Sequence, residues 1–229
     1  MMWRIGSKKI SLKWLKGKES GKDVYILANG PSLKSLDLSF LRGETVIGMN
    51  ASALIEKKYG VVSKYYVVSD KRFMDVEEKK KIVTSDLCEE TIRILRSDIE
   101  AVDSDGLEHR SIYVKPLERD GFSKNISNGF FYGCTTTMLA LQLAYYIGAK
   151  NVYLLGCDLK YPKESPRFYK EEKPQLSDSF VSVQIKNISE SRQFFQSRGG
   201  DLFGCSQDSF LRSYLPYYSL DEHRVKEDL

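Results

Sequence analysis

Short apolar runs alternate with longer segments of helical character along most of the chain. The runs are four or five residues long, rich in Val, Ile, Leu and Tyr, and most are followed by Gly, Asn or Asp. They cover 24–28, 45–49, 65–69, 111–114, 151–155 and 201–205. Runs of this length and composition, bounded by turn residues, are typical of strands buried on both faces.

The segments between these runs predict helices. Residues 51–59, 136–147 and 180–197 are the clearest, and Gly148 stands where a helix C-cap is expected. The charged stretch 71–105 predicts one or two surface helices, including one over 88–96.

Strands alternating with helices predict a parallel sheet covered on both sides. The predicted fold is therefore a single Rossmann-like, doubly wound α/β domain with a mainly parallel sheet. It is expected to occupy residues 23–229, after a basic leader of residues 1–22.

Composition removes several classes of protein. The 229 residues are 41% hydrophobic and 29% charged, an ordinary globular mixture. Four scattered cysteines and two histidines, without a Cys-x-x-Cys pair, argue against a zinc finger or a disulfide scaffold. A net charge of +4 is too small to indicate nucleic-acid binding. No apolar run is long enough for a membrane span or a signal peptide, so a cytoplasmic location is expected.

The leader allows two interpretations. It carries seven Lys or Arg against one Glu, with Trp3 and Trp14 among them. One interpretation is a poorly ordered tail or a short helix lying on the domain. The other is peripheral contact with the anionic inner face of a membrane, where basic residues and Trp are favourable.

Small and polar residues follow the predicted strands, at the edge where ligands bind in doubly wound sheets. The first strand leads into Asn29-Gly30-Pro31-Ser32, which can offer N–H groups and a hydroxyl to a phosphate at a helix start. It can equally be a tight turn with Ser32 as a helix cap. The turn matches neither the Walker A pattern nor the Gly-x-Gly-x-x-Gly fingerprint.

The other strand ends give further candidates, each with a purely structural alternative. Asp158 can accept hydrogen bonds from ribose or bind a metal, and Asp70 and Asn50 can bind ligand or terminate their strands. Thr135 and Thr136 open the apolar helix, as phosphate ligands or as caps. Additional candidates are the loop tyrosines Tyr161 and Tyr169, which can donate to a leaving phosphate.

Taken together, these motifs resemble two related groups. Residues Gly21 to Asp37 (GKDVYILANGPSLKSLD) and Thr136 to Tyr161 (TTMLALQLAYYIGAKNVYLLGCDLKY) are similar to the 6-hydroxymethylpterin pyrophosphokinase-like (MptE-like) family of bacterial polysaccharide clusters and to the bacterial sialyltransferases that use CMP-sialic acid. Gly48-Met49-Asn50 and Ser69-Asp70 fall between them in the expected order, and residues 195–211 resemble the closing helix and strand.

The resemblance implies a nucleotide site. Its members would be Asn29, Gly30, Pro31, Ser32, Asn50, Thr135, Thr136, Gly156 and Asp158, with Tyr161 and Tyr169 assisting phosphate departure. Two departures from the sialyltransferases stand out. No histidine lies between Leu159 and Glu222, and Tyr132-Gly133 replaces the Arg expected before the threonine pair. The general base is left open among His109, Glu164, Asp178 and His223.

Three functions follow as hypotheses. The first is a glycosyltransferase of bacterial surface-polysaccharide assembly that takes a CMP-type sugar donor and a glycan or lipid-linked acceptor without a cofactor. The second is transfer of pyrophosphate from ATP to a small hydroxymethyl compound, with Mg²⁺ on Asp70 and Asp158. The third is a nucleotide-binding module without catalysis.

Overall fold

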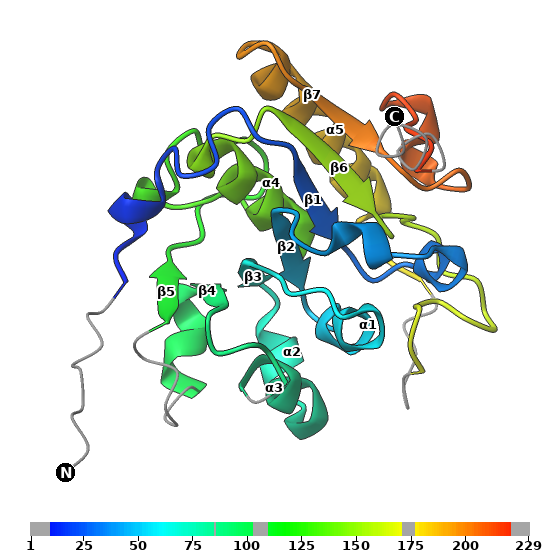
Figure 1. The fold of residues 1–229 in the computed structure, drawn as a ribbon, viewed down its shortest axis with the longest axis horizontal. Coiled ribbons are helices and arrows are strands. Elements are labelled where there is room, and N and C mark those ends of the chain that lie inside the picture. Colours follow the sequence, from blue (N-terminus) through cyan, green and yellow to red (C-terminus); the bar gives the residue numbers. More distant parts are fainter. Residues whose placement is uncertain (1–9, 85, 103–109, 171–176, 221–229) are drawn as a thin grey trace.

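The structure, a computed structural model, describes residues 10–84, 86–102, 110–170 and 177–220. Its centre is one sheet of seven parallel strands (Figure 1). These are β1 (Val24–Leu27), β2 (Val46–Met49), β3 (Tyr65–Val68), β4 (Ile92–Arg96), β5 (Ser111–Val114), β6 (Asn151–Leu155) and β7 (Asp201–Gly204).

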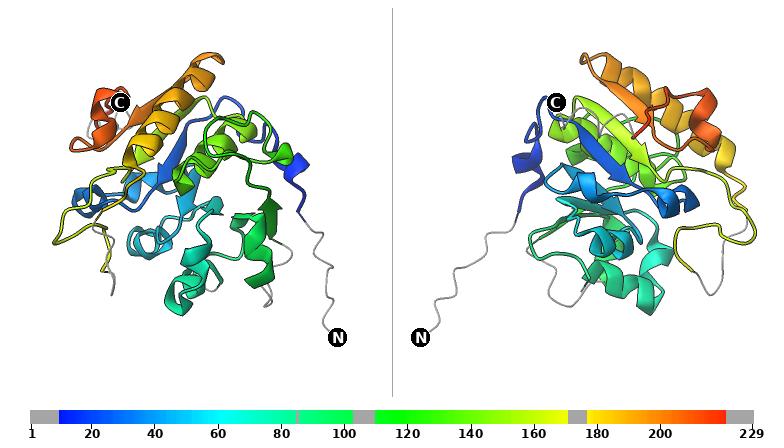
Figure 2. Two further views of the ribbon diagram at one scale, coloured as in Figure 1. Left: turned by 180° about the vertical axis from the view of Figure 1, so that it is seen from behind. Right: turned by 45° about the vertical axis from the view of Figure 1, so that its right-hand side comes forward.

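Helices connect the strands and lie on both sides of the sheet (Figures 1 and 2). The α-helices are α1 (Ala53–Tyr59), α2 (Lys71–Met74), α3 (Glu77–Thr84), α4 (Thr136–Ile147) and α5 (Val181–Gln196). Short 3₁₀ helices are η1 (Leu12–Leu15), η2 (Pro31–Ser35), η3 (Ser39–Leu41), η4 (Ser97–Val102), η5 (Ile126–Asn128) and η6 (Phe210–Ser213). The predicted doubly wound α/β fold is confirmed, and every strand pair in the sheet is parallel.

The strand order is β5-β4-β3-β2-β1-β6-β7. The chain thus builds outward from β1 to β5, then returns to place β6 on the other side of β1. Ile26 pairs with Leu154 in that central register. The direction of winding reverses between β1 and β6, which is where such folds leave a crevice at the carboxyl ends of the strands.

Side chains of the strands alternate between two cores, as a sheet covered on both faces requires. Ile26 and Leu154 point into the core formed with α4 and α5. Tyr25 and Tyr153 point the other way, toward η2, η3 and α1, and their rings stack with centroids 5.1 Å apart. All twelve residues of α4 are buried, so this helix is enclosed by the sheet and its neighbours.

One predicted helix is wrong. Residues 88–96 contain strand β4, which pairs with β3 and β5. Arg93, its second residue, is only 4% exposed, and its guanidinium donates to the backbone oxygens of Val83 and Thr91. An arginine within a strand gave the sequence a charged, helix-like pattern, although its side chain is buried and hydrogen-bonded to backbone carbonyls.

The described part of the leader, residues 10–22, packs against the domain through η1. Leu15 is buried, and the backbone of Gly17, Glu19 and Gly21 donates to the oxygens of residues 146–148 at the end of α4. This matches the interpretation of a short helix lying on the domain. In the part of the chain that the structure describes, no helix has the length and apolar character needed to cross a membrane.

Candidate functional site

A cleft of about 800 Å³ opens at the carboxyl ends of the central strands. Its floor comes from the residues that follow β1, β2, β3 and β6, and its walls come from α2, the start of α4 and the loops after β5 and β6. This volume suits a nucleotide or a small activated substrate. The cleft lies at the β1/β6 reversal, the position predicted from the fold.

The turns after β1 and β6 are joined by hydrogen bonds. The Gly30 N–H donates to the Gly156 oxygen at 2.7 Å. The Asp158 carboxylate accepts from the Ser32 N–H at 2.8 Å and from the Ser32 hydroxyl at 2.6 Å. Asp158 is only 3% exposed. The Asp158 carboxylate therefore caps the first turn of η2 by accepting both hydrogen bonds from Ser32, although the two residues are 126 positions apart in the sequence.

Asn29 joins β1 to β2. Its side-chain amide donates to the Met49 oxygen at 3.2 Å, and its oxygen accepts from the Ala51 N–H at 3.0 Å. This buried pair of bonds fixes the turn that follows each strand. Asn29 thus shapes the cleft floor by holding two strand ends in place.

Asn50 is the most distinctive residue of the floor. Its backbone has a φ of 51°, a left-handed conformation that Asn tolerates better than most residues. Its side-chain oxygen Oδ1 is buried, and within the described residues it has no hydrogen-bond partner. Because a buried acceptor without a donor is unfavourable, a hydrogen-bonding ligand in the cleft would stabilise this arrangement.

The start of α4 forms one wall. Thr135 is the N-cap, and its hydroxyl oxygen accepts from the Thr137 N–H at 3.3 Å. The Thr136 hydroxyl lies 3.0 Å from that of Ser69, which ties the helix to the end of β3. The positive end of the α4 dipole therefore faces the cleft, where it favours an anion.

The loop after β6 forms the opposite wall. The Phe168 N–H donates to the Asn29 oxygen at 3.2 Å, so the loop is attached to the turn after β1. Tyr161 and Tyr169 both line the cleft. Burial raises the pKa of Tyr161, and the nearby Asp178 adds to this effect although the Arg167 guanidinium opposes it. Tyr161 therefore keeps its proton at neutral pH and can donate a hydrogen bond.

The geometry does not favour one magnesium ion shared by Asp70 and Asp158. These residues follow β3 and β6, which are separated by β2 and β1. Three inter-strand steps put the strand ends about 14 Å apart. The Asp70 carboxylate is also occupied by Arg72, with Nη2 to Oδ2 at 2.9 Å, and Asp158 by Ser32. No cluster of three or more His, Cys, Asp or Glu side chains suited to a metal occurs among the described residues.

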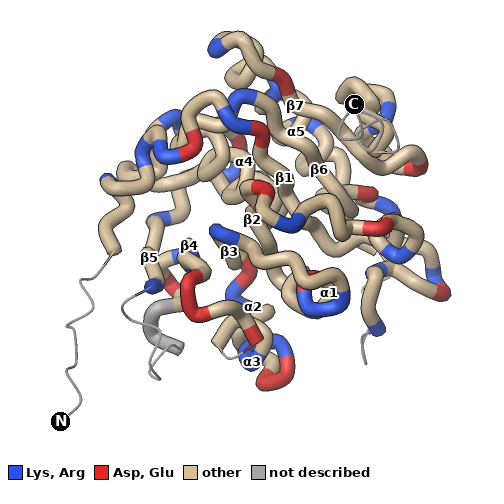
Figure 3. Tube along the Cα trace, viewed as in Figure 1, with Lys and Arg blue, Asp and Glu red and all other residues tan. Residues whose placement is uncertain are grey.

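The cleft carries more basic residues than the strand-end motifs indicated. Seven basic side chains line it against three acidic ones, Asp70, Asp158 and Asp178. The basic residues are Lys71, Arg72, Lys79, Arg96, Arg119, Lys160 and Arg167. Elsewhere in the view of Figure 3, basic and acidic positions are interspersed along the chain.

Arg119 is informative among these residues. The Gly133 N–H donates to the Arg119 backbone oxygen at 2.9 Å, so the segment before the threonine pair runs beside Arg119. Tyr132 and Gly133 stand where the resemblance to the sialyltransferases predicts an Arg, and Arg119 lines the cleft from an earlier part of the same connection between β5 and α4. Arg96 also lines the cleft, from the end of β4. Its position at a strand end could have identified it from the sequence, but residues 88–96 were interpreted as a helix.

Most of the predicted site residues are brought together, and some are not. Those that line the cleft are Asn29, Gly30, Asn50, Asp70, Thr135, Thr136, Gly156, Asp158, Tyr161 and Tyr169. Pro31 and Ser32 lie behind this surface, at the start of η2. The candidate bases His109 and His223 lie outside the described residues, and Glu164 is exposed away from the cleft. Asp178 lines it.

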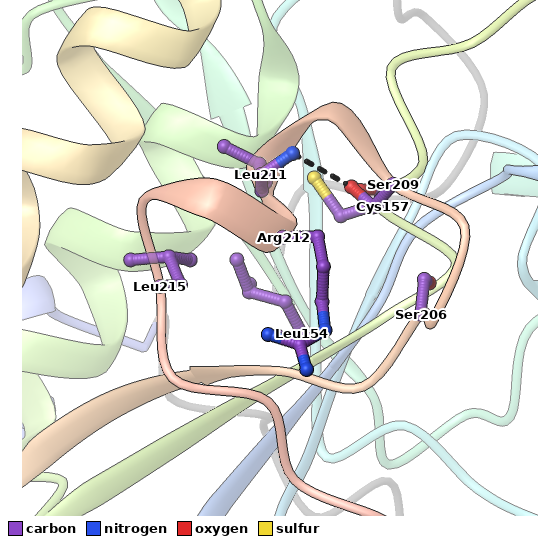
Figure 4. Close-up of a pocket in the computed structure, with 8 residues that line it drawn as sticks. Leu154, Cys157, Ser206, Ser209, Leu211, Arg212 and Leu215 are labelled. Carbon is purple, nitrogen blue, oxygen red and sulfur yellow. Dashed lines mark hydrogen bonds between the residues drawn. The ribbon is translucent and has the colours of Figure 1, made fainter.

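A second, very small cavity lies between the end of β6 and the turn at η6 (Figure 4). Its volume is about 10 Å³, and Leu154, Leu211 and Leu215 contribute to its lining. The Ser209 hydroxyl beside it accepts from the Leu211 N–H at 3.0 Å and donates to the Cys157 oxygen at 2.8 Å. A space of this size holds one water molecule at most, so it is a packing feature of the turn.

The sheet order and the cleft define a doubly wound α/β protein with its candidate site at the switch point. The chain belongs to the MptE-like family: the model of that family, described as 6-hydroxymethylpterin diphosphokinase MptE-like, matches residues 7–164. The family resemblance seen in the sequence is confirmed.

Curated relatives and solved structures extend this result. The chain is 25% identical to a probable 3-deoxy-manno-octulosonic acid transferase of Salmonella typhimurium, covering 90% of both proteins. It is 27% identical to the protein of the same name from Escherichia coli K12, covering 90% of this chain and 85% of the relative.

The fold is shared with two solved glycosyltransferases. One is the sialyltransferase CstII from Campylobacter jejuni, solved with the substrate analogue cytidine-5'-monophosphate (TM-score 0.54, 15% identity, 87% of this chain and 86% of that one). The other is the MAf glycosyltransferase from Magnetospirillum magneticum AMB-1 (TM-score 0.58, 13% identity, 93% of this chain and 39% of that one).

Proposed function

We propose that the protein is a glycosyltransferase of surface-polysaccharide assembly that transfers a CMP-activated sugar acid to a glycan or lipid-linked acceptor. Two independent likenesses support this class. The curated relatives are named for transfer of 3-deoxy-manno-octulosonic acid, and a structural neighbour is a sialyltransferase studied with CMP. Both sugars are acids with a carboxylate on the anomeric carbon, so one kind of activated donor serves both.

The observation that carries the proposal is the charge and shape of the cleft. Seven basic side chains and the positive end of α4 surround a space large enough for a nucleotide sugar. Both the phosphate and the sugar carboxylate of such a donor are anionic. Positive groups fixed before the reaction stabilise the charge that develops on the departing phosphate.

The chemistry assigned to this cleft needs no bound metal. As the bond from the anomeric carbon to the phosphate oxygen breaks, CMP leaves with the electron pair. Tyr161 keeps its proton and can donate to that phosphate from the loop after β6, and Tyr169 lines the same wall. The Thr135 and Thr136 hydroxyls with the start of α4 can bind the phosphate from the other wall.

Transfer of pyrophosphate from ATP is the second candidate, because the family's description is a diphosphokinase. That reaction relies on Mg²⁺ to neutralise the transferred groups. The separation of Asp70 from Asp158 does not provide one shared ion site, so this candidate would need other ligands. A nucleotide-binding module without catalysis is the third candidate, and experiments must distinguish it from the two transferases.

Nucleotide binding tests the proposal first. We expect CMP to raise the melting temperature without Mg²⁺, because a ligand at 100 times its Kd adds about 2.7 kcal/mol to the unfolding free energy. CMP-3-deoxy-manno-octulosonic acid and CMP-sialic acid should then release CMP in the presence of an acceptor. Stabilisation only by ATP with Mg²⁺ would favour diphosphotransfer, and CMP binding without turnover of either donor would favour a binding module.

Asn50 provides a sharper test of the cleft. Replacing it with glycine removes the unpartnered Oδ1 while keeping a residue that tolerates a φ of 51°. We expect the Kd for CMP, measured by calorimetry, to rise by about tenfold, the loss of one well-made hydrogen bond. Asn50→Ala is the matched variant: its affinity should match that of Asn50→Gly, and it should melt lower because alanine is strained at this φ. Unchanged affinity in both variants would contradict the assigned floor.

The proposal extends to the N-terminal segment, where contact with a membrane would bring the enzyme to a lipid-linked acceptor. Trp14 on η1 is 54% exposed, beside the exposed Lys13 and Lys16. We expect the protein to sediment with vesicles containing about a third anionic lipid, and to lose most of that binding in a Trp14→Ala, Lys13→Glu, Lys16→Glu variant. Equal binding of both proteins, or binding insensitive to salt, would rule out this surface.

A further inference from the structure

Transfer to a hydroxyl requires a base, and three carboxylates line the cleft within the described residues: Asp70, Asp158 and Asp178. From their surroundings, and on the basis of the proposed function, we infer that Asp178 is the general base that takes the proton of the acceptor hydroxyl. Two observations support this assignment. The Asp178 carboxylate accepts hydrogen bonds from neutral donors, and it lies beside the start of α4.

Asp158 and Asp70 are committed to other contacts. Asp158 is almost fully buried and accepts two short hydrogen bonds from Ser32 that fix the turn after β1. Asp70 forms a two-pronged ion pair with Arg72, whose Nε and Nη2 lie 3.0 and 2.9 Å from its two oxygens. Both Asp70 oxygens are therefore engaged by the guanidinium, and transfer of a proton to either oxygen would break the ion pair.

Asp178 has a different environment. Its Oδ1 accepts from the Phe180 N–H at 2.9 Å, directly before α5. Its Oδ2 accepts from the Gln184 side chain at 2.8 Å and lies 3.5 Å from the Tyr161 hydroxyl. These donors are all neutral, and Oδ1, whose single donor among the described residues is the Phe180 N–H, has a second lone pair that can point to an acceptor in the cleft.

Gln184 also fixes where this carboxylate lies. The same Gln184 nitrogen donates to the Cys134 oxygen at 2.9 Å, immediately before the threonines that open α4. One amide group therefore links the Asp178 carboxylate to the wall assigned to the donor phosphate. A base held there is adjacent to the reacting bond, and Gln184 is its positioning residue.

The charged and titratable groups around Asp178 come from each neighbouring element. Arg72 of α2 interacts with it electrostatically, and Tyr161 and the Arg167 that lies over the Tyr161 ring come from the loop after β6. Cys134 precedes α4, and its thiol pKa is raised by burial and by Asp178 although Arg119 lowers it. The guanidinium groups around Asp178 therefore lie on the side of α2 and of the loop after β6, and the neutral thiol of Cys134 lies on the side of α4.

The step balances without a further reactant. The acceptor hydroxyl oxygen forms a bond to the anomeric carbon as the bond from that carbon to the phosphate oxygen breaks. The hydroxyl proton moves to an Asp178 oxygen, CMP leaves with the electron pair, and the protonated carboxyl then returns its proton to water. Carboxylates act as bases for hydroxyl groups in this way at sugar centres.

The test compares Asp178→Asn with the control Asp208→Asn, whose exposed carboxylate pairs with Lys160 near the same loop. Asparagine can still accept from the Phe180 N–H and loses only the hydrogen bond from Gln184 to Oδ2, so the protein should stay folded with a slightly lower melting temperature and an unchanged Kd for CMP. We expect kcat for transfer to fall by about 10²- to 10⁴-fold in Asp178→Asn and to change little in the control. Formate should restore part of the activity of Asp178→Ala, because a small carboxylate can enter the space left by the side chain.

The outcomes separate the inference from the function on which it rests. Transfer by Asp178→Asn within about threefold of the unmodified protein would overturn the assignment. Loss of transfer together with loss of CMP affinity, and without formate rescue, would assign Asp178 a structural role and also overturn it. An unmodified protein that transfers no CMP-linked sugar would instead refute the proposed function, and the base with it.

Discussion

Replacing Gly30 with alanine is expected to lower the unfolding free energy by about 3 kcal/mol or more. A Cβ atom at this position would lie 2.4 Å from Asp158 Oδ2 and 2.5 Å from the Gly156 backbone oxygen. Neither atom can move freely, because Gly156 accepts the Gly30 N–H and Asp158 is held by Ser32. The two turns at the switch point would have to separate, opening the floor of the cleft.

Thermal unfolding checks this prediction, with Gly204→Ala as the matched control. At Gly204 in β7 the nearest atom to an added Cβ is Leu215 Cβ, at 3.9 Å, an ordinary contact. We expect Gly30→Ala to melt about 6 to 12 °C lower and Gly204→Ala to melt at or above the unmodified protein. A Gly30→Ala protein that melts normally and binds CMP normally would contradict the close approach of the two turns.

The fold could be predicted because its strands are apolar on both faces. Residues 24–27 and 152–155 are continuous hydrophobic runs, which is what a strand between two cores requires. β4 was not predicted because the charged residue Arg93 lies within it. The Arg93 guanidinium donates to the backbone oxygens of Val83 and Thr91, and no local sequence pattern predicts such partners.

The edge of the sheet that carries the site was also predictable, because strand ends meet at one edge whatever the order of the strands. The role of each residue at that edge could not be predicted. Ser32 was predicted either to face a ligand or to cap a helix, and its hydroxyl donates to Asp158, a contact that depends on β6 returning beside β1. Arg119 lies in the connection after β5, beyond the strand end itself, so only the three-dimensional arrangement identifies it.

The second large expected effect is on the pH dependence of stability, and it arises from two buried glutamates whose pKa values are shifted in opposite directions. Glu19, fully buried, lies 2.6 Å from Lys64 Nζ and 3.0 Å from Lys22 Nζ, and accepts from the Tyr65 hydroxyl at 2.8 Å. Burial alone would raise its pKa, but these partners outweigh burial and lower it. Within the described residues Glu56 forms no ion pair with a lysine or arginine: Ser52 and Ser63 donate to it, and burial raises its pKa.

Glu19→Gln is therefore expected to lower the unfolding free energy by about 2 to 3 kcal/mol at pH 7, below the cost of breaking a fully buried pair because both lysines reach solvent. A lowered pKa stabilises the fold above the unfolded pKa of about 4.3, and this contribution is lost as the pH falls through the folded pKa. The gap between Glu19→Gln and the unmodified protein should narrow below pH 4.

Glu56→Gln should behave in the opposite way. The raised pKa of Glu56 means that its ionisation opposes folding as the pH rises above the unfolded value, and an amide removes that penalty. We expect Glu56→Gln to be as stable as the unmodified protein or more stable between pH 7 and pH 8. Urea unfolding of the three proteins from about pH 3 to pH 8 measures both effects. A Glu19→Gln protein as stable as the unmodified one at pH 7 would show that the carboxylate does not anchor the N-terminal segment to the sheet.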